Sequence, residues 1–181
     1  MSNAYRASFA TIALLAASTG YAATTTYFNN LTGPAESPPN ASPATGTTTV
    51  AYTASTHMLQ VDVTFSGLLG TTTASHIHCC TTTPGTLTAG VATQTPTFSG
   101  FPIGVASGTY SQTFDLTLAS SFNPAFVTAN GGSVAASEAA LVAGIASGRA
   151  YLNVHSSVFA GGEIRGFLLP RSIFVDGFEG P

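Results

Sequence analysis

The chain has 181 residues, of which 44% are hydrophobic and only 6% are charged, far below the roughly 25% of ordinary soluble domains. Its net charge of −3 and its lack of lysine argue against a nucleic acid or an anionic lipid surface as partner. Threonine, serine, alanine and glycine dominate, and short runs of β-branched residues favour strands over helices. We therefore expect a single all-β domain.

Residues 1–22 are typical of a secretory signal peptide. Arg6 supplies the positive start, an apolar stretch covers residues 7–17, and Gly20 and Ala22 offer the small residues of a cleavage site. The apolar stretch is shorter than the about 20 residues that span a bilayer, and no later segment comes near that length. We predict a secreted or periplasmic chain without a transmembrane segment, with three arginines against seven acidic residues after cleavage.

The domain is predicted to cover residues 24–170 and to begin with a strand-like piece at residues 26–28. A loop rich in proline follows, where neither helix nor central strand is compatible with three prolines in six residues. Alternation of polar and apolar residues then predicts two strands, at residues 45–53 and 59–65, with a turn near Ser55. A third strand is expected at residues 72–78.

The second half of the domain mixes irregular chain with one helix. Residues 81–108 contain several glycines and prolines and are predicted to form a long excursion. A strand is expected at residues 109–118, and a helix at residues 133–147 that ends at Gly148. Two last strands, residues 149–155 and 163–169, are expected to form a hairpin through the Gly161-Gly162 turn, before a C-terminal tail at residues 171–181.

Three histidines form a candidate metal site. In the segment His76-Ile77-His78 the two imidazoles lie on the same face of a strand, because side chains alternate with a period of two. The same alternation puts His155 on one face with Tyr151 and Asn153. Three neutral imidazoles would suit zinc or copper with one open position. The alternative is that these histidines only form hydrogen bonds at a polar end of the sheet, because they meet only if the strand order allows it.

Cys79 and Cys80 are the two cysteines of the chain, and they directly follow His78. In an oxidising compartment a free pair would be unusual. Three interpretations stay open: a vicinal disulfide, a thiolate ligand supplied by Cys80 to a soft metal, and pairing between molecules. We favour the disulfide, although adjacent cysteines close only a strained ring.

Glu163 and Arg165 are expected to lie on one face of the last strand and to form a buried structural ion pair. No nucleophile elbow, phosphate-binding loop or dinucleotide motif is present in the sequence. We therefore name no catalytic residue.

Four segments occur here in an order that resembles the CHRD domain, the module named from chordin. They are Glu36-Ser37-Pro38-Pro39, the HIH of residues 76–78, the YLNVH of residues 151–155 and the GGEIRG of residues 161–166. The resemblance covers about residues 27–169 and implies an extracytoplasmic antiparallel β-sandwich or barrel-like module, similar to those of exported bacterial proteins. It implies no defined biochemical activity, and the doublet Cys79-Cys80 lies outside the core pattern.

The function expected from these observations is that of a secreted, non-enzymatic module. It would bind copper or zinc through His76, His78 and His155, or an extracellular or cell-surface partner. Two other classes stay open: a metalloenzyme with a three-histidine site, and a structural or adhesive surface protein suggested by the uncharged, threonine-rich strands.

Overall fold

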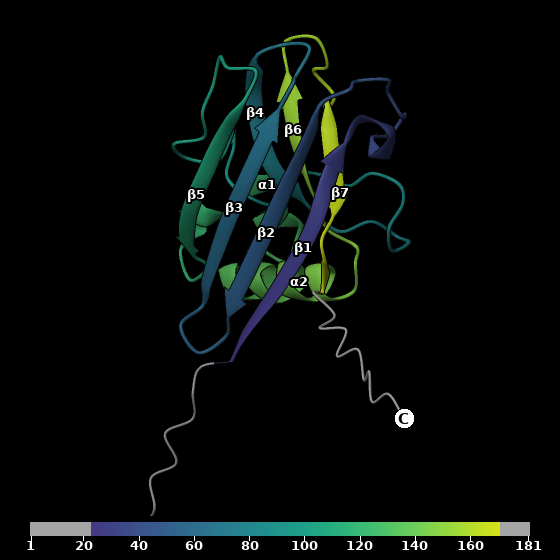
Figure 1. Ribbon diagram of the computed structural model, residues 1–181. Helices are drawn as coiled ribbons and strands as arrows, with labels where there is room; N and C mark the ends of the chain where they lie inside the picture. Colours follow the sequence, from purple (N-terminus) through teal and green to yellow (C-terminus); the bar gives the residue numbers. More distant parts are fainter. Residues whose placement is uncertain (1–22, 171–181) are drawn as a thin grey trace, which may run out of the picture.

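Eight antiparallel strands form one curled sheet, a half-barrel, in the computed structural model of the chain (Figure 1). The structure describes residues 23–170, so the predicted signal peptide and C-terminal tail lie outside the described residues. The strands are β1 (Thr24–Thr32), β2 (Thr45–Thr53), β3 (Met58–Ser66), β4 (Thr72–His78), β5 (Gly108–Asp115), β6 (Tyr151–Ser156), β7 (Ile164–Phe167) and β8 (Leu169–Pro170). The all-β prediction is confirmed, and the architecture is the barrel-like one.

The strand order is β4-β6-β7-β1-β2-β3-β5, with β8 added beside β1. β1, β2, β3 and β5 form a meander with a continuous register, in which Tyr27 pairs with Val50 and Val50 with Val61. The last hairpin, β6–β7, is inserted between β1 and β4. This insertion places β6 directly beside β4, and it thereby brings two segments together that are about 75 residues apart in sequence.

Two helices cover one face of the sheet near its lower end in Figure 1. The expected helix is α2 (Val134–Ala146), whose N-terminus is capped by Ser133. The structure adds a second helix, α1 (Pro124–Ala129), which sequence reasoning missed because six residues are too few to show a helical period. Short 3₁₀ turns occur at Gly33–Ala35 and Ala119–Ser121. Among residues 23–170, no helix is long and apolar enough to cross a bilayer.

The core lies between the concave face of the sheet and the segments that cover it. Fully buried side chains include those of Val61 from β3, Ile77 from β4, Leu141 from α2 and Ile164 from β7. The long excursion after β4 contributes Phe98, whose ring packs 5.8 Å from Tyr110 and 5.3 Å from Phe114, measured between centroids. The excursion is therefore held to the core by its own aromatic residues.

Most strands begin or end at other residues than predicted, and β1 is much longer than the piece expected at residues 26–28. Two of the differences have a visible cause. The strand expected at residues 109–118 ends at Asp115, because the Asp115 carboxylate accepts hydrogen bonds from the backbone and the hydroxyl of Thr117 and turns the chain. The last strand is interrupted at Leu168, whose backbone N–H donates to Ala150 O. β7 and β8 are therefore separate strands.

Candidate metal centre

His76, His78 and His155 converge on one face of the β4–β6 pair. In the register of these strands Ala74 faces His155, and His76 faces Asn153. Because alternate residues share a face, His155 is the diagonal neighbour of His76. One ring nitrogen from each histidine lies within 4.8 Å of the other two, and this is the one group of possible metal ligands of this kind among residues 23–170. The strand order thus meets the condition that the sequence left open.

Each imidazole is held by a hydrogen bond to a backbone carbonyl. His76 Nε2 lies 2.7 Å from Pro96 O, His78 Nδ1 lies 2.9 Å from Ala89 O, and His155 Nδ1 lies 2.9 Å from Ala160 O. A carbonyl oxygen can only accept, so each of these nitrogens carries the hydrogen. In a neutral ring the other nitrogen is then bare. Donation of one N–H to a carbonyl is also how metal-binding histidines are oriented in proteins.

The second nitrogen of each ring is the one left available to a metal ion. His76 Nδ1 and His155 Nε2 are buried and have no hydrogen-bond partner among residues 23–170. His78 Nε2 lies 3.1 Å from Oδ1 of Asn153. A buried polar atom without a partner is uncommon and is often explained by an ion or a functional role. Two such atoms, beside a third imidazole, fit the nitrogen ligands that zinc and copper prefer.

Burial keeps the three rings neutral at physiological pH. It lowers the pKa of His76, His78 and His155 below the ordinary value of histidine. The shift is largest for His78, whose pKa falls to about 4, with a further contribution from repulsion by the other two imidazoles. Neutral imidazole is the form that binds metal, so protons compete little at this site near pH 7.

Tyr151 packs against His78 and in turn contacts Arg165. The His78 ring stacks on Tyr151, with 4.7 Å between centroids and 4° between planes. The Arg165 guanidinium lies over two aromatic rings, 4.8 Å from the centroid of Tyr151 and 5.5 Å from that of Phe167. Contacts with both His78 and Arg165 restrict the Tyr151 ring and, through it, the plane of His78.

The expected ion pair between Glu163 and Arg165 is not the one in the structure. Arg165 pairs with Glu36, at 3.8 Å between Nε and Oε2, and both side chains are 5% exposed. Arg165 extends toward the proline-rich loop, where it also donates to the carbonyl oxygen of Ala35. A further hydrogen bond, of 3.1 Å, reaches the carbonyl oxygen of Leu87 in the excursion after β4. Sequence alternation could not reveal this partner, because Glu36 lies about 130 residues away.

Glu163 is instead bound by neutral donors. Its Oε1 accepts from Ser42 Oγ and from the backbone N–H of Leu69, each at 2.6 Å. Burial alone would raise the pKa of Glu163, but hydrogen bonds from Ser156, Ser42 and the backbone outweigh it and lower the pKa. The side chain thus ties the proline-rich loop and the β3–β4 turn to β7.

The cysteines lie next to the histidines but do not join them. The sulfurs of Cys79 and Cys80 lie at bonding distance, as in a vicinal disulfide, and both approach the carbonyl oxygen of Ala140 in α2. Neither belongs to the group of convergent ligands among the described residues. The arrangement favours the disulfide over a thiolate ligand.

Sequence reasoning missed most of the residues that support the histidines. The carbonyl groups of Ala89 and Pro96 come from the irregular excursion, and that of Ala160 from the β6–β7 turn. No side-chain pattern marks a carbonyl group. Asn153 was placed on the correct face, but its contact with His78 depends on strand order.

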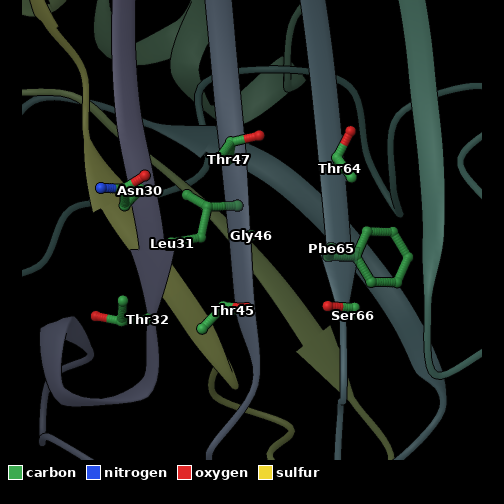
Figure 2. A pocket seen from close by; sticks show the side chains of 9 residues that line it. All are labelled: Asn30, Leu31, Thr32, Thr45, Gly46, Thr47, Thr64, Phe65 and Ser66. Carbon is green, nitrogen blue, oxygen red and sulfur yellow. The ribbon is translucent and has the colours of Figure 1, made fainter.

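A shallow hollow lies on another part of the sheet. It has a volume of about 440 Å³ and is drawn in Figure 2. Its lining residues come from β1, β2 and β3: Asn30, Leu31, Thr32, Thr45, Gly46, Thr47, Thr64, Phe65 and Ser66. None of these side chains titrates near neutral pH or binds metals readily. The hollow therefore offers no metal ligands of the kind that the histidine cluster provides.

Comparison with known proteins gives one family. The model of the CHRD domain matches residues 27–168. No curated protein and no solved structure matches the chain. The matched segment contains all three histidines, both cysteines and Glu36.

Proposed function

This chain belongs to the CHRD domain family, and we propose that its domain binds one transition-metal ion, copper or zinc, through His76, His78 and His155. The observation that carries the proposal is the state of the ring nitrogens. Each histidine donates one N–H to a backbone carbonyl, and His76 Nδ1 and His155 Nε2 are buried without a hydrogen-bond partner among residues 23–170. One ring nitrogen of each histidine lies within 4.8 Å of the other two. The arrangement suits an ion better than it suits a hydrogen-bonded polar cluster, which would leave no such atoms.

The distances between the three ligand nitrogens are somewhat longer than in a metal-bound site, so the rings would have to move toward the ion. Nitrogens bound tetrahedrally to zinc at about 2.0–2.1 Å are about 3.3 Å apart. The ligand atoms here lie within 4.8 Å of one another. Movements of each ring on the order of an ångström would bring them to the ion, and rotation of a side chain supplies this without moving the strands.

The proposed role is binding, and it assigns no reaction to the domain. The predicted signal peptide supports a place outside the cytoplasm, where the module would hold the ion or present it to a surface partner. Expression in a bacterial host, fractionation, and N-terminal sequencing of the exported chain would test this part. Cleavage near Ala22 and recovery outside the cytoplasm are expected, and an intact leader on a cytoplasmic chain would overturn it.

Titration of the purified chain with Zn²⁺ and Cu²⁺ tests the metal site. We expect one ion per chain and a rise in melting temperature, because an ion that binds only the folded state stabilises it by mass action. His76→Ala, His78→Ala and His155→Ala should each abolish the rise. The matched control is His57→Ala, because His57 lies in the β2–β3 turn and pairs with Glu138 at 2.8 Å.

The two outcomes are distinct. One ion per chain that persists in His57→Ala and is lost in the three other variants supports the site. Absence of saturable binding by the wild-type chain, or binding lost equally in His57→Ala, overturns the proposal.

A further inference from the structure

The contact between His78 and Asn153 brings two acceptors face to face. His78 Nδ1 donates to Ala89 O, so a neutral His78 presents the lone pair of Nε2. The atom opposite, at 3.1 Å, is the carbonyl oxygen of the Asn153 amide. Two lone pairs at this separation repel each other unless a cation or a hydrogen lies between them. A second hydrogen on the ring would place a charged imidazolium at a buried position, which is unfavourable.

Two arrangements remove the repulsion. In one, the Asn153 amide is turned over, so that its NH₂ group donates to His78 Nε2 and blocks that nitrogen as a metal ligand. In the other, the oxygen stays where it is and shares a cation with His78. The position of an amide oxygen is assigned from its surroundings, so the groups around the other end of Asn153 decide between them.

Glu36 lies at that other end. A Cβ added at Gly162 would overlap both Oε1 of Glu36 and Nδ2 of Asn153, so only the space of a missing side chain separates these two groups. Oε1 of Glu36 is buried and has no hydrogen-bond partner in the part of the chain that the structure describes. A carboxyl oxygen attracts the NH₂ end of an amide and repels its oxygen end. Glu36 therefore favours the orientation that directs Asn153 Oδ1 toward His78.

We infer that Asn153 Oδ1 is the fourth ligand of the metal site, oriented by Glu36. The inference rests on the proposed function and adds an oxygen donor to the three nitrogens. The separation of 3.1 Å between His78 Nε2 and Asn153 Oδ1 is close to the about 3.3 Å between neighbouring ligands of a four-coordinate zinc ion. Asn153 is 2% exposed, so its side chain is fixed by packing. Glu36 acts as a positioning residue.

The inference explains why Gly162 has no side chain. Gly162 has a φ of 128°, which disfavours other residues, and any Cβ there would separate Glu36 from Asn153. Because Gly162 has no side chain, Glu36 of the proline-rich loop can approach Asn153, which contacts His78. Glu36 of the proline-rich loop and the turn at Gly162 together position Asn153 as the proposed ligand.

Substitution of Asn153 tests the inference, because the two arrangements predict opposite changes in the affinity for Zn²⁺. If Asn153 Oδ1 is a ligand, Asn153→Ala should weaken Zn²⁺ binding by about tenfold or more, in the range seen when supporting groups of metal sites are lost. Asn153→Asp keeps an oxygen at the same position and should retain binding. If the amide instead donates to His78 Nε2, Asn153→Ala would free that nitrogen and leave binding equal or tighter.

Visible absorption of the Co²⁺ form supplies a readout that a merely structural role would not move. Asn153→Ala should change the d–d bands of bound Co²⁺, whereas Asn153→Asp should keep a four-coordinate spectrum. Glu36→Ala should weaken Zn²⁺ binding by about tenfold with the wild-type Co²⁺ spectrum at saturation. Urea unfolding with chelator present measures the metal-free stability of each variant, so that a loss of affinity is not confused with misfolding.

The outcomes separate the two proposals. Binding that needs the three histidines but is unchanged in affinity and Co²⁺ spectrum by Asn153→Ala overturns the fourth ligand and leaves the three-histidine site standing. A wild-type chain that binds neither Zn²⁺ nor Co²⁺ overturns both. Weaker binding and an altered spectrum in Asn153→Ala, with retention in Asn153→Asp, support the inference.

Discussion

Gly144 lies where helix α2 passes over the cysteine pair. A Cβ at this position would overlap the sulfur atoms of both Cys79 and Cys80. Gly144 is buried, and its neighbours on the same face of the helix, Leu141 and Ile145, are buried as well. The helix can approach β4 this closely because Gly144 has no side chain. Gly144→Ala is therefore expected to destabilise the fold.

The expected magnitude is the difference between two terms. Forcing one methyl group into a filled interior costs about 1–3 kcal/mol. Alanine in place of glycine within a helix contributes about 1 kcal/mol in the opposite direction. The two obstructing sulfur atoms lie at bonding distance from each other between the helix and the sheet and have little space to move aside, so the cost lies in the upper part of its range. We expect a net loss of about 1–2 kcal/mol in the free energy of unfolding.

Urea unfolding followed by far-UV circular dichroism, without reductant, measures this loss. The control is the same substitution in a chain that carries Cys79→Ala and Cys80→Ala. Without sulfurs the methyl group has room, and Gly144→Ala should then stabilise by about 0.5–1 kcal/mol. A Gly144→Ala variant as stable as the wild type, or one that loses equal stability in both backgrounds, would refute the reasoning.

Three further predictions concern the carboxyl groups and the cysteines. Burial raises the pKa of Glu36 to about 7. In metal-free protein, protonated Glu36 therefore contributes up to about 3 kcal/mol to the free energy of unfolding below about pH 4.5, and this contribution is lost as the pH rises to 7. Urea unfolding should show that Glu36→Gln abolishes this fall in stability. Glu163→Gln should lower the free energy of unfolding by about 2 kcal/mol at pH 7, because hydrogen bonds to a charged carboxylate are lost. Because the pKa of Glu163 is lowered, the difference in stability between wild type and variant should become smaller below about pH 4.5. Intact-mass measurement should find the unreduced chain lighter than the reduced chain by two hydrogen atoms, as a Cys79–Cys80 disulfide requires, with no disulfide-linked dimer; equal masses would mean free thiols.

The strands could be predicted because each has one face toward the core and one toward solvent. The alternation of Leu59, Val61, Val63 and Phe65 with polar residues defines β3, and the prediction for β4 matches the structure from Thr72 to His78. Period-two alternation also placed His76 and His78 on one face. A pattern of this kind is local, and it reports the face of a residue without its neighbour across the sheet.

The remaining parts of the site depend on contacts between distant segments. Whether His155 meets His76 is decided by the insertion of the β6–β7 hairpin beside β4, which no local pattern specifies. The pair of Glu36 with Arg165 has the same origin, and the sequence favoured Glu163 only because it is near in the chain. Helix α1 was missed for a different reason, since Pro124–Ala129 is too short to show a period.

β4 is an edge strand, with β6 as its one partner in the sheet order. Its other side is covered by the excursion that follows it, through hydrogen bonds such as Cys79 N to Gly90 O and Ala92 N to Ile77 O. The excursion also supplies the carbonyl oxygens that hold His76 and His78. Two of the three histidines are thus covered by a segment that its hydrogen bonds and the buried ring of Phe98 hold in place, so an ion bound as proposed could leave on that side only after this segment opens. The rate at which an ion enters or leaves would then follow the opening of this segment, and affinity and exchange rate could be changed independently.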